Sequence, residues 1–138
     1  MCQVKKVNQM KLAAVILISI SLTGCATVKG WVPSFWDDNQ STKIVDVRQK
    51  VENLDCAKDQ LPQITAIRAD LQWFQLYSES KGWRQADVLR VIQPMQETVE
   101  DMYKRAQGTQ GSKVYCDLKK KVMQQQSKRA AEAVLGRF

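Results

Sequence analysis

The chain has 138 residues, of which 44% are hydrophobic and 25% are charged, a composition typical of one small globular domain. It contains no histidine, which excludes a Ser-His-Asp or Cys-His mechanism supplied by this chain alone and argues against a zinc or copper site. The formal net charge of +7 is basic but does not require nucleic acid as a partner.

The N-terminal segment, residues 1–24, has the pattern of an export signal. Lys5, Lys6 and Lys11 precede residues 12–22, a run of 11 apolar or small residues. This run is too short to span a bilayer, which needs about 20 residues. Met10 stands directly before the run and is a candidate for the true start of translation. Without the three lysines, 18 basic residues remain against 14 acidic ones, a mild excess that fits an anionic lipid or polymer nearby.

The apolar run ends in Leu22-Thr23-Gly24-Cys25, which resembles a bacterial lipobox. The resemblance implies cleavage between Gly24 and Cys25, a diacylglyceryl thioether on Cys25 and a further acyl chain on the new amine. Two or three acyl chains hold a protein at a membrane almost irreversibly, because each buried methylene adds about 0.8 kcal/mol. Ala26 replaces the aspartate that often retains such lipoproteins in the inner membrane, which favours the outer membrane. The alternatives are a buried apolar helix and an uncleaved membrane span.

Residues 25–41 are predicted to form the acylated cysteine and a tether, because Gly30 and Pro33 interrupt any helical period. The adjacent acids Asp37 and Asp38 are interpreted as part of a solvated tether rather than as a catalytic pair. Three aromatic side chains in the tether are candidates for contact with the membrane interface, namely Trp31, Phe35 and Trp36. Such rings suit the lipid headgroups, but they would equally suit a position folded back onto the domain.

Residues 42–138 are predicted to form an all-α periplasmic domain, a small antiparallel bundle of about four helices. The first helix is expected to begin at a cap supplied by Asn39, Ser41 or Thr42 and to end near Cys56. The second runs from about residue 59 to Gly82, the third from 84 to 107, and the fourth from a cap at Ser112 to residue 135. Apolar residues at spacings of three and four define the expected core. They are Ile44, Val47, Val51, Leu54, Ile64, Ile67, Leu71, Phe74, Val88, Ile92, Met95, Val99, Met102 and Ala106, with Leu118, Val122 and Ala133 in the fourth helix.

Pro94 must either kink the third helix or split it in two. The split is slightly favoured, because the acids Glu97, Glu100 and Asp101 follow, and a helix N-terminus favours acids. The same three acids are possible metal ligands, but a charged first helical turn explains them more simply. No metal and no cofactor are therefore predicted.

Cys56 and Cys116 are predicted to form a disulfide. In an up-down-up-down bundle, the end of the first helix and the start of the fourth lie at the same pole on adjacent helices. An exported chain also occupies an oxidising compartment, where a bridge closing about 60 residues stabilises the fold by roughly 4 kcal/mol. The alternative is a pair of buried free thiols.

Four lysines are predicted to share about a third of the circumference of the fourth helix: Lys113, Lys120, Lys121 and Lys128. Such a strip can bind an anionic partner, such as lipid phosphates or an acidic polymer. Asp117 lies within the strip and can pair with Lys113 or Lys121, which favours an ordinary solvated surface.

The sequence contains no nucleophile motif and no phosphate-binding loop, and Ser78, Ser80 and Ser112 have no base partner. We therefore expect a non-enzymatic, lipid-anchored envelope protein with a structural or partner-binding role. Its partners would be the membrane, through the acyl chains, and an envelope protein or polymer. The alternative is a phage-encoded lipoprotein that alters the host envelope, in superinfection exclusion or as an accessory to lysis.

Overall fold

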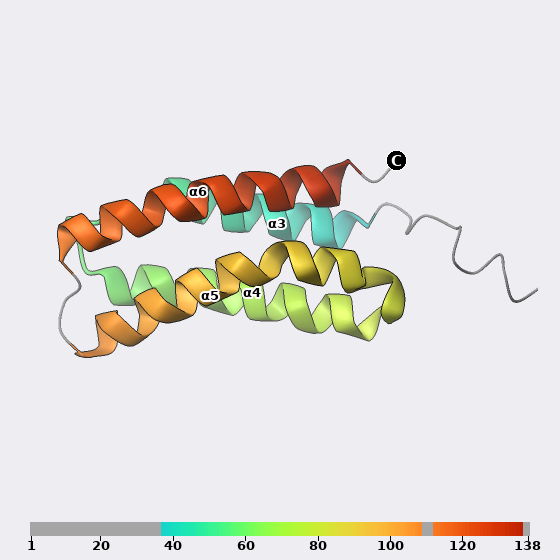
Figure 1. Ribbon diagram of the computed structural model, residues 1–138, viewed down its shortest axis with the longest axis horizontal. Helices are drawn as coiled ribbons and strands as arrows, with labels where there is room; N and C mark the ends of the chain where they lie inside the picture. The colour runs from blue at the N-terminus through green and yellow to red at the C-terminus, as the bar shows by residue number, and fades with distance from the viewer. Residues whose placement is uncertain (1–36, 109–111, 137–138) are drawn as a thin grey trace, which may run out of the picture. The chain divides into compact units, whose positions relative to one another are not determined.

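The computed structural model describes residues 37–108 and 112–136 (Figure 1). They form four long helices, α3 (Asp38–Glu52), α4 (Gln60–Ser80), α5 (Ala86–Gly108) and α6 (Lys113–Leu135), with a short 3₁₀ helix, η2 (Trp83–Gln85), between α4 and α5. Helices α3 and α5 each pack against α4 and α6, and neighbouring helices run antiparallel. The predicted all-α antiparallel bundle is confirmed.

The core lies between the four helices and contains most of the residues predicted from their spacing. Each helix presents one apolar face inward, and burial of a large aliphatic side chain contributes about 1.5 to 3 kcal/mol. The largest fully buried side chains include Phe74, Ile92, Met95, Met102 and Met123. The prediction that Met95 and Met102 are core residues is therefore confirmed.

Helix α3 begins at Asp38, four residues before the predicted domain boundary at residue 42. Asp37 is the cap: its Oδ1 accepts hydrogen bonds from the backbone N–H groups of Asn39 (2.9 Å) and Gln40 (3.2 Å). The prediction that Asp37 and Asp38 belong to a solvated tether is therefore wrong, because a carboxylate that satisfies free N–H groups starts the helix there. Helix α3 also ends earlier than predicted, at Glu52 instead of near Cys56.

The other helix ends follow the predicted capping residues. Asp59 Oδ1 accepts from the N–H of Leu61 at the start of α4 (3.1 Å), and Ser112 Oγ accepts from the N–H of Tyr115 at the start of α6 (3.2 Å). Gly82 follows the end of α4 with a φ of 85°, a conformation that side-chain-bearing residues rarely adopt.

Helix α5 continues through Pro94, so the favoured split at this residue is wrong. An interior proline costs about 3 kcal/mol, chiefly through the lost hydrogen bond to the preceding turn. Buried residues lie on both sides of Pro94 in one stripe: Val88, Ile92, Met95, Val99 and Met102. The free energy gained by burying these five side chains exceeds the cost of the proline. Pro94 itself lies on the exposed side of the helix.

Helix α6 is rotated relative to the prediction, which placed Leu118, Val122 and Ala133 toward the core. Leu118 is 61% exposed, Val122 is also exposed and Ala133 is half-buried. The buried face consists of Cys116, Met123, Ser127, Ala130, Ala131 and Val134. Cys116 sets this rotation because its sulfur is bonded to Cys56, and Leu118 lies about 200° further around the helix.

Candidate functional site

The predicted bridge between Cys56 and Cys116 is present and joins the loop after α3 to the first turn of α6. Their Cα atoms are 5.7 Å apart, and the bridge closes a sequence separation of 60. We call this end of the bundle, where the α3–α4 loop meets the start of α6, the disulfide pole. The opposite end, where α3 begins and α4 turns into α5, we call the tether pole (Figure 1).

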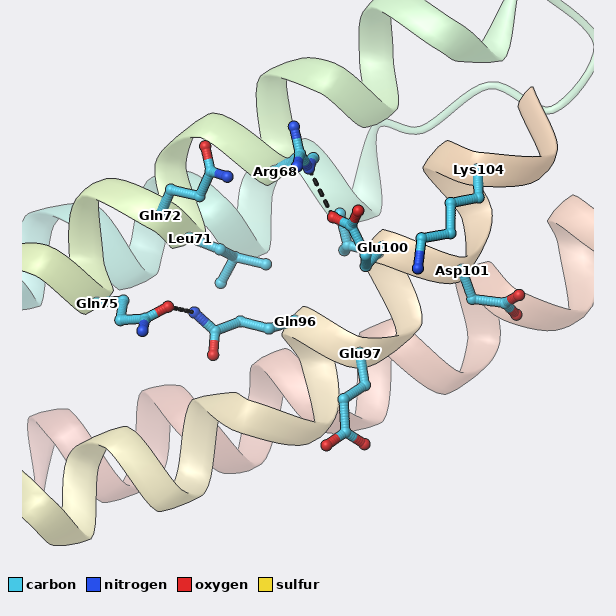
Figure 2. A pocket seen from close by; sticks show the side chains of 10 residues that line it. Arg68, Leu71, Gln72, Gln75, Gln96, Glu97, Glu100, Asp101 and Lys104 are labelled. Atoms are coloured by element: carbon cyan, nitrogen blue, oxygen red, sulfur yellow. Dashed lines mark hydrogen bonds and ion pairs between the residues drawn. The ribbon is translucent and has the colours of Figure 1, made fainter. Parts of the chain in front are cut away.

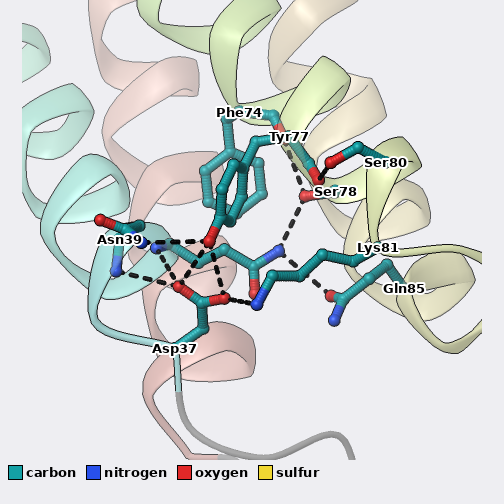
Figure 3. A network of polar contacts seen from close by, with 9 residues as sticks. Asp37, Asn39, Phe74, Tyr77, Ser78, Ser80, Lys81 and Gln85 are labelled. Carbon is teal, nitrogen blue, oxygen red and sulfur yellow. Dashed lines mark hydrogen bonds and ion pairs between the residues drawn. The ribbon is translucent and has the colours of Figure 1, made fainter.

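A network of polar contacts holds the tether pole together (Figure 3). The side chain of Asp37 is only 6% exposed and forms an ion pair with Lys81, at the end of α4. The hydroxyl of Tyr77 donates a hydrogen bond to Asp37 Oδ2 (3.2 Å). Asp37 therefore both caps α3 and links it to α4.

Gln40 extends this network into the interior. Its Nε2 donates to Ser78 Oγ (2.9 Å) and to Gln85 Oε1 (3.1 Å). Ser78 in turn donates to the carbonyl of Phe74 (2.8 Å), so its hydroxyl is fully engaged within the bundle. These contacts fix the turn between α4 and α5 relative to α3 and give the network a structural role.

A groove lies between α4 and α5 and has a volume of about 480 Å³ (Figure 2). Leu71 and Val99 contribute apolar surface to it. Two contacts cross the groove: Arg68 Nε to Glu100 Oε2 (2.6 Å) and Gln96 Nε2 to Gln75 Oε1 (2.8 Å). These cross-links join the two helices and occupy polar atoms that a ligand would otherwise contact.

The three acids that follow Pro94 do not converge. Glu100 turns toward Arg68 on α4, whereas Asp101 contacts Lys119 of α6 (3.0 Å). Glu97 accepts a hydrogen bond from Gln93 of its own helix (3.0 Å). Within residues 37–108 and 112–136, no three acidic or cysteine side chains are grouped so as to hold a metal ion.

Asp101 and Tyr115 form a clamp between α5 and α6. The hydroxyl of Tyr115 donates to Asp101 Oδ2 at 2.5 Å. This hydrogen bond, with that from Lys119, lowers the pKa of Asp101 to about 2. Burial and the bond to Asp101 raise the pKa of Tyr115 to about 12. Both groups keep one protonation state near neutral pH, where a general acid or base must exchange its proton.

The four lysines of the predicted basic strip have different surroundings. Lys113 pairs with Asp117 (2.7 Å), and Lys120 is half-buried and donates to the carbonyl of Leu54 (2.8 Å). Lys121 and Lys128 remain exposed and line a shallow groove with Arg48 of α3. The strip is thus not one continuous surface, because Lys120 faces the neighbouring loop.

An exposed apolar stripe on α6 was missed by the sequence analysis. It consists of Val114, Leu118 and Val122, which lie four residues apart on the outer side of the helix. We call these three residues the outer stripe of α6. Leu118 and Val122 are predicted from their spacing to lie in the core, and Val114 is not among the predicted residues. Exposed apolar surface of this kind is typical of protein contact sites.

The predicted lipidation and cleavage residues, Gly24 and Cys25, and the predicted interface residues Trp31, Phe35 and Trp36 lie outside the described residues. None of the described helices is both long and apolar enough to cross a membrane. Comparison of the chain with protein-family models, curated proteins and solved structures finds no match. The proposal for function therefore rests on the residues of this chain.

Proposed function

We propose that the chain is an envelope lipoprotein, held at the membrane through acylated Cys25, whose bundle binds another envelope component without catalysing a reaction. The observation that carries the proposal is Leu22-Thr23-Gly24-Cys25 at the end of a short apolar run preceded by lysines. Ala26, directly after the acylated cysteine, supports location at the outer membrane, with the domain in the periplasm.

The paired cysteines support an exported domain. Disulfides persist in oxidising compartments such as the periplasm and are rare where thiols are kept reduced. Cys56 and Cys116 are both buried, so their bridge braces the interior of the bundle. A small domain with a modest core gains most from such a brace.

The polar clusters support binding rather than catalysis. Asp37 and Asp101 are each held by side chains of another helix. The pKa values of Asp101 and Tyr115 are displaced away from neutrality, whereas an efficient general acid or base has a pKa near the working pH. These groups therefore hold helices together.

The outer stripe of α6 supports an envelope protein as the partner. Its three apolar side chains are bordered by the exposed cation Lys121, and this mixture of apolar centre and charged edge is common at protein interfaces. The stripe begins at the disulfide pole, away from the end of the bundle to which the tether is joined.

Mass spectrometry of the mature protein purified from a bacterial host tests the anchor. We expect an N-terminus at Cys25 carrying a diacylglyceryl group, and loss of the lipid and of membrane retention in Cys25→Ser. Cys2→Ser is the matched control and should leave both unchanged, because Cys2 precedes the cleavage point. An unmodified Cys25 in the purified protein would overturn the proposal.

Photocrosslinking in intact cells tests the partner surface. A photoreactive residue at position 118 is expected to capture a single envelope protein, and Val114→Asp should abolish that adduct. Position 76 is the matched control, because Leu76 on α4 is as exposed (66%) as Leu118 (61%). The same adducts from both positions would show that the contact is not specific to α6.

A further inference from the structure

We infer that the tether pole is a membrane-contact surface, where Trp83 and Arg84 lie in the headgroup layer of the bilayer. The inference rests on the proposed anchor at Cys25 and adds a second contact, made by the folded domain itself. The occupant of this surface is a phospholipid bilayer rather than a protein.

The segment that follows the proposed anchor at Cys25 joins the bundle at this pole. Only residues 26–36 separate Cys25 from Asp37, and a fully extended segment between these two residues spans at most about 40 Å. Asp37 is paired with Lys81, and the turn bearing Trp83 follows Lys81 directly. Figure 1 shows this turn and the start of α3 at the same end of the bundle. Because the tether is short, a second contact between this end of the bundle and the membrane forms at a high effective concentration.

Trp83 offers the membrane an uncovered aromatic ring. Its side chain is 65% exposed, although a tryptophan on a folded domain usually gains from burial. Indole rings favour the boundary between water and lipid, where the ring is apolar and its N–H finds a hydrogen-bond acceptor.

The cation beside this ring, Arg84, fits a lipid phosphate. The guanidinium carbon of Arg84 lies 5.6 Å from the centroid of the Trp83 ring. Lys81 forms an ion pair with Asp37, which reduces the repulsion between this carboxylate and an anionic headgroup. Arginine forms two parallel hydrogen bonds with a phosphate, which makes it suited to this layer.

The turn is held in place before any contact with lipid. Gly82 takes a φ of 85°, which reverses the chain after α4. Gln40 is hydrogen-bonded to Ser78 before the turn and to Gln85 after it, so both sides of the turn are fixed to α3. A side chain on a fixed turn loses little conformational entropy on binding.

Tryptophan fluorescence of the full acylated chain tests the inference. The variant Trp31→Phe/Trp36→Phe/Trp73→Phe leaves Trp83 as the only tryptophan. The matched control, Trp31→Phe/Trp36→Phe/Trp83→Phe, leaves Trp73, which is 40% exposed on the side of α4 and stacks on Tyr77. Both are reconstituted in vesicles of equal parts phosphatidylethanolamine and phosphatidylglycerol, with and without bromine on the acyl chains.

We expect brominated lipid to quench Trp83 and shift its emission to shorter wavelengths, with little change for Trp73. Adding Arg84→Gln to the Trp83-only protein should reduce the quenching. Circular dichroism checks that each variant is folded, and mass spectrometry checks the lipid on Cys25. If Cys25 is acylated and Trp83 is not quenched, or is quenched no more than Trp73, the inference is wrong and the proposed function stands. If Cys25 carries no lipid, both are wrong.

Discussion

Asp37 and Lys81 form an ion pair that joins the residue before α3 to the residue after α4, across a sequence separation of 44. The same carboxylate caps α3. The first described residue of the chain is therefore fixed to the α4–α5 turn. Two different links thus close the bundle, polar contacts at the tether pole and a disulfide at the other end.

Replacement of Asp37 tests the polar link. We expect Asp37→Ala to lower the free energy of unfolding by about 1 to 2 kcal/mol, because it removes a helix cap and leaves Lys81 and Tyr77 without their partner. Asp37→Asn should cost less, since asparagine also caps helices. Asp38→Asn is the control, and this exposed site should change stability by less than about 0.5 kcal/mol. Urea unfolding followed by circular dichroism measures all three, and equal effects at positions 37 and 38 would contradict the prediction.

The Cys56–Cys116 bridge should be visible as a linked peptide pair in non-reducing mass spectrometry. We expect Cys56→Ser/Cys116→Ser to lose about 4 kcal/mol of stability in the chain-entropy model for a loop of this size. Changing both residues avoids a free thiol, and the wild type treated with a reductant should resemble the double variant. Two alkylatable thiols in the oxidised wild type would rule out the bridge.

Pro94→Ala should stabilise the protein, by about 1 kcal/mol or more, because alanine restores a backbone N–H that can donate to the carbonyl of Arg90. Pro94 is exposed, so the change removes little packing. If α5 were split at this residue, proline would begin the second half favourably and alanine would destabilise it. Thermal unfolding distinguishes the two cases, with Gln93→Ala as the neighbouring exposed control.

Leu118→Lys is expected to change the free energy of unfolding by less than about 0.5 kcal/mol, because this side chain is exposed. Met123→Ala, one turn further along α6, should cost about 2 to 5 kcal/mol, because Met123 is fully buried. Chemical denaturation of both variants tests the rotation of α6. A large loss of stability in Leu118→Lys would show that this face of the helix lies in the core.

The contact between Asp101 and Tyr115 predicts a pH dependence at both extremes. The pKa of Asp101 is lowered to about 2, so its contribution is present above the ordinary value of 3.8 and is lost as the pH falls toward 2. The pKa of Tyr115 is raised to about 12, so stability falls as the pH rises from 10 toward 12.

Tyr115→Phe should flatten the loss of stability at alkaline pH, because it removes the phenolic proton. It should also weaken the loss of stability at acid pH, because the hydrogen bond from Tyr115 is the largest cause of the lowered pKa of Asp101. It keeps the aromatic ring over which Arg105 and Lys119 lie. Stability measured against pH for the wild type and the variant provides the test. Identical profiles at high pH would contradict the prediction.

Most helix ends and the disulfide could be predicted from the sequence, whereas the number of helices depended on whether Pro94 splits the third one. Helices α4 and α6 start directly after their caps, Asp59 and Ser112, close to the predicted positions, because capping depends on residues within one turn of each other. The pairing of Cys56 with Cys116 followed from the alternating direction of the helices and from the oxidising compartment expected for an exported chain. The proposed lipidation motif, Leu22 to Cys25, could be predicted because it consists of adjacent residues.

The rotation of each helix and the contacts between distant polar groups depend on how the helices pack together. The apolar residues of α6 lie on two faces, so their spacing alone could not select the buried face, which is the one that carries Cys116. The link from Asp37 to α4 depends on Tyr77 and Lys81, about 40 residues away, so neighbouring residues could not reveal this link. Pro94 remains within one helix because the free energy of burying the side chains on both sides of it exceeds the local cost of a proline in a helix. Local rules place helix ends, whereas long-range burial and pairing decide what each face contacts.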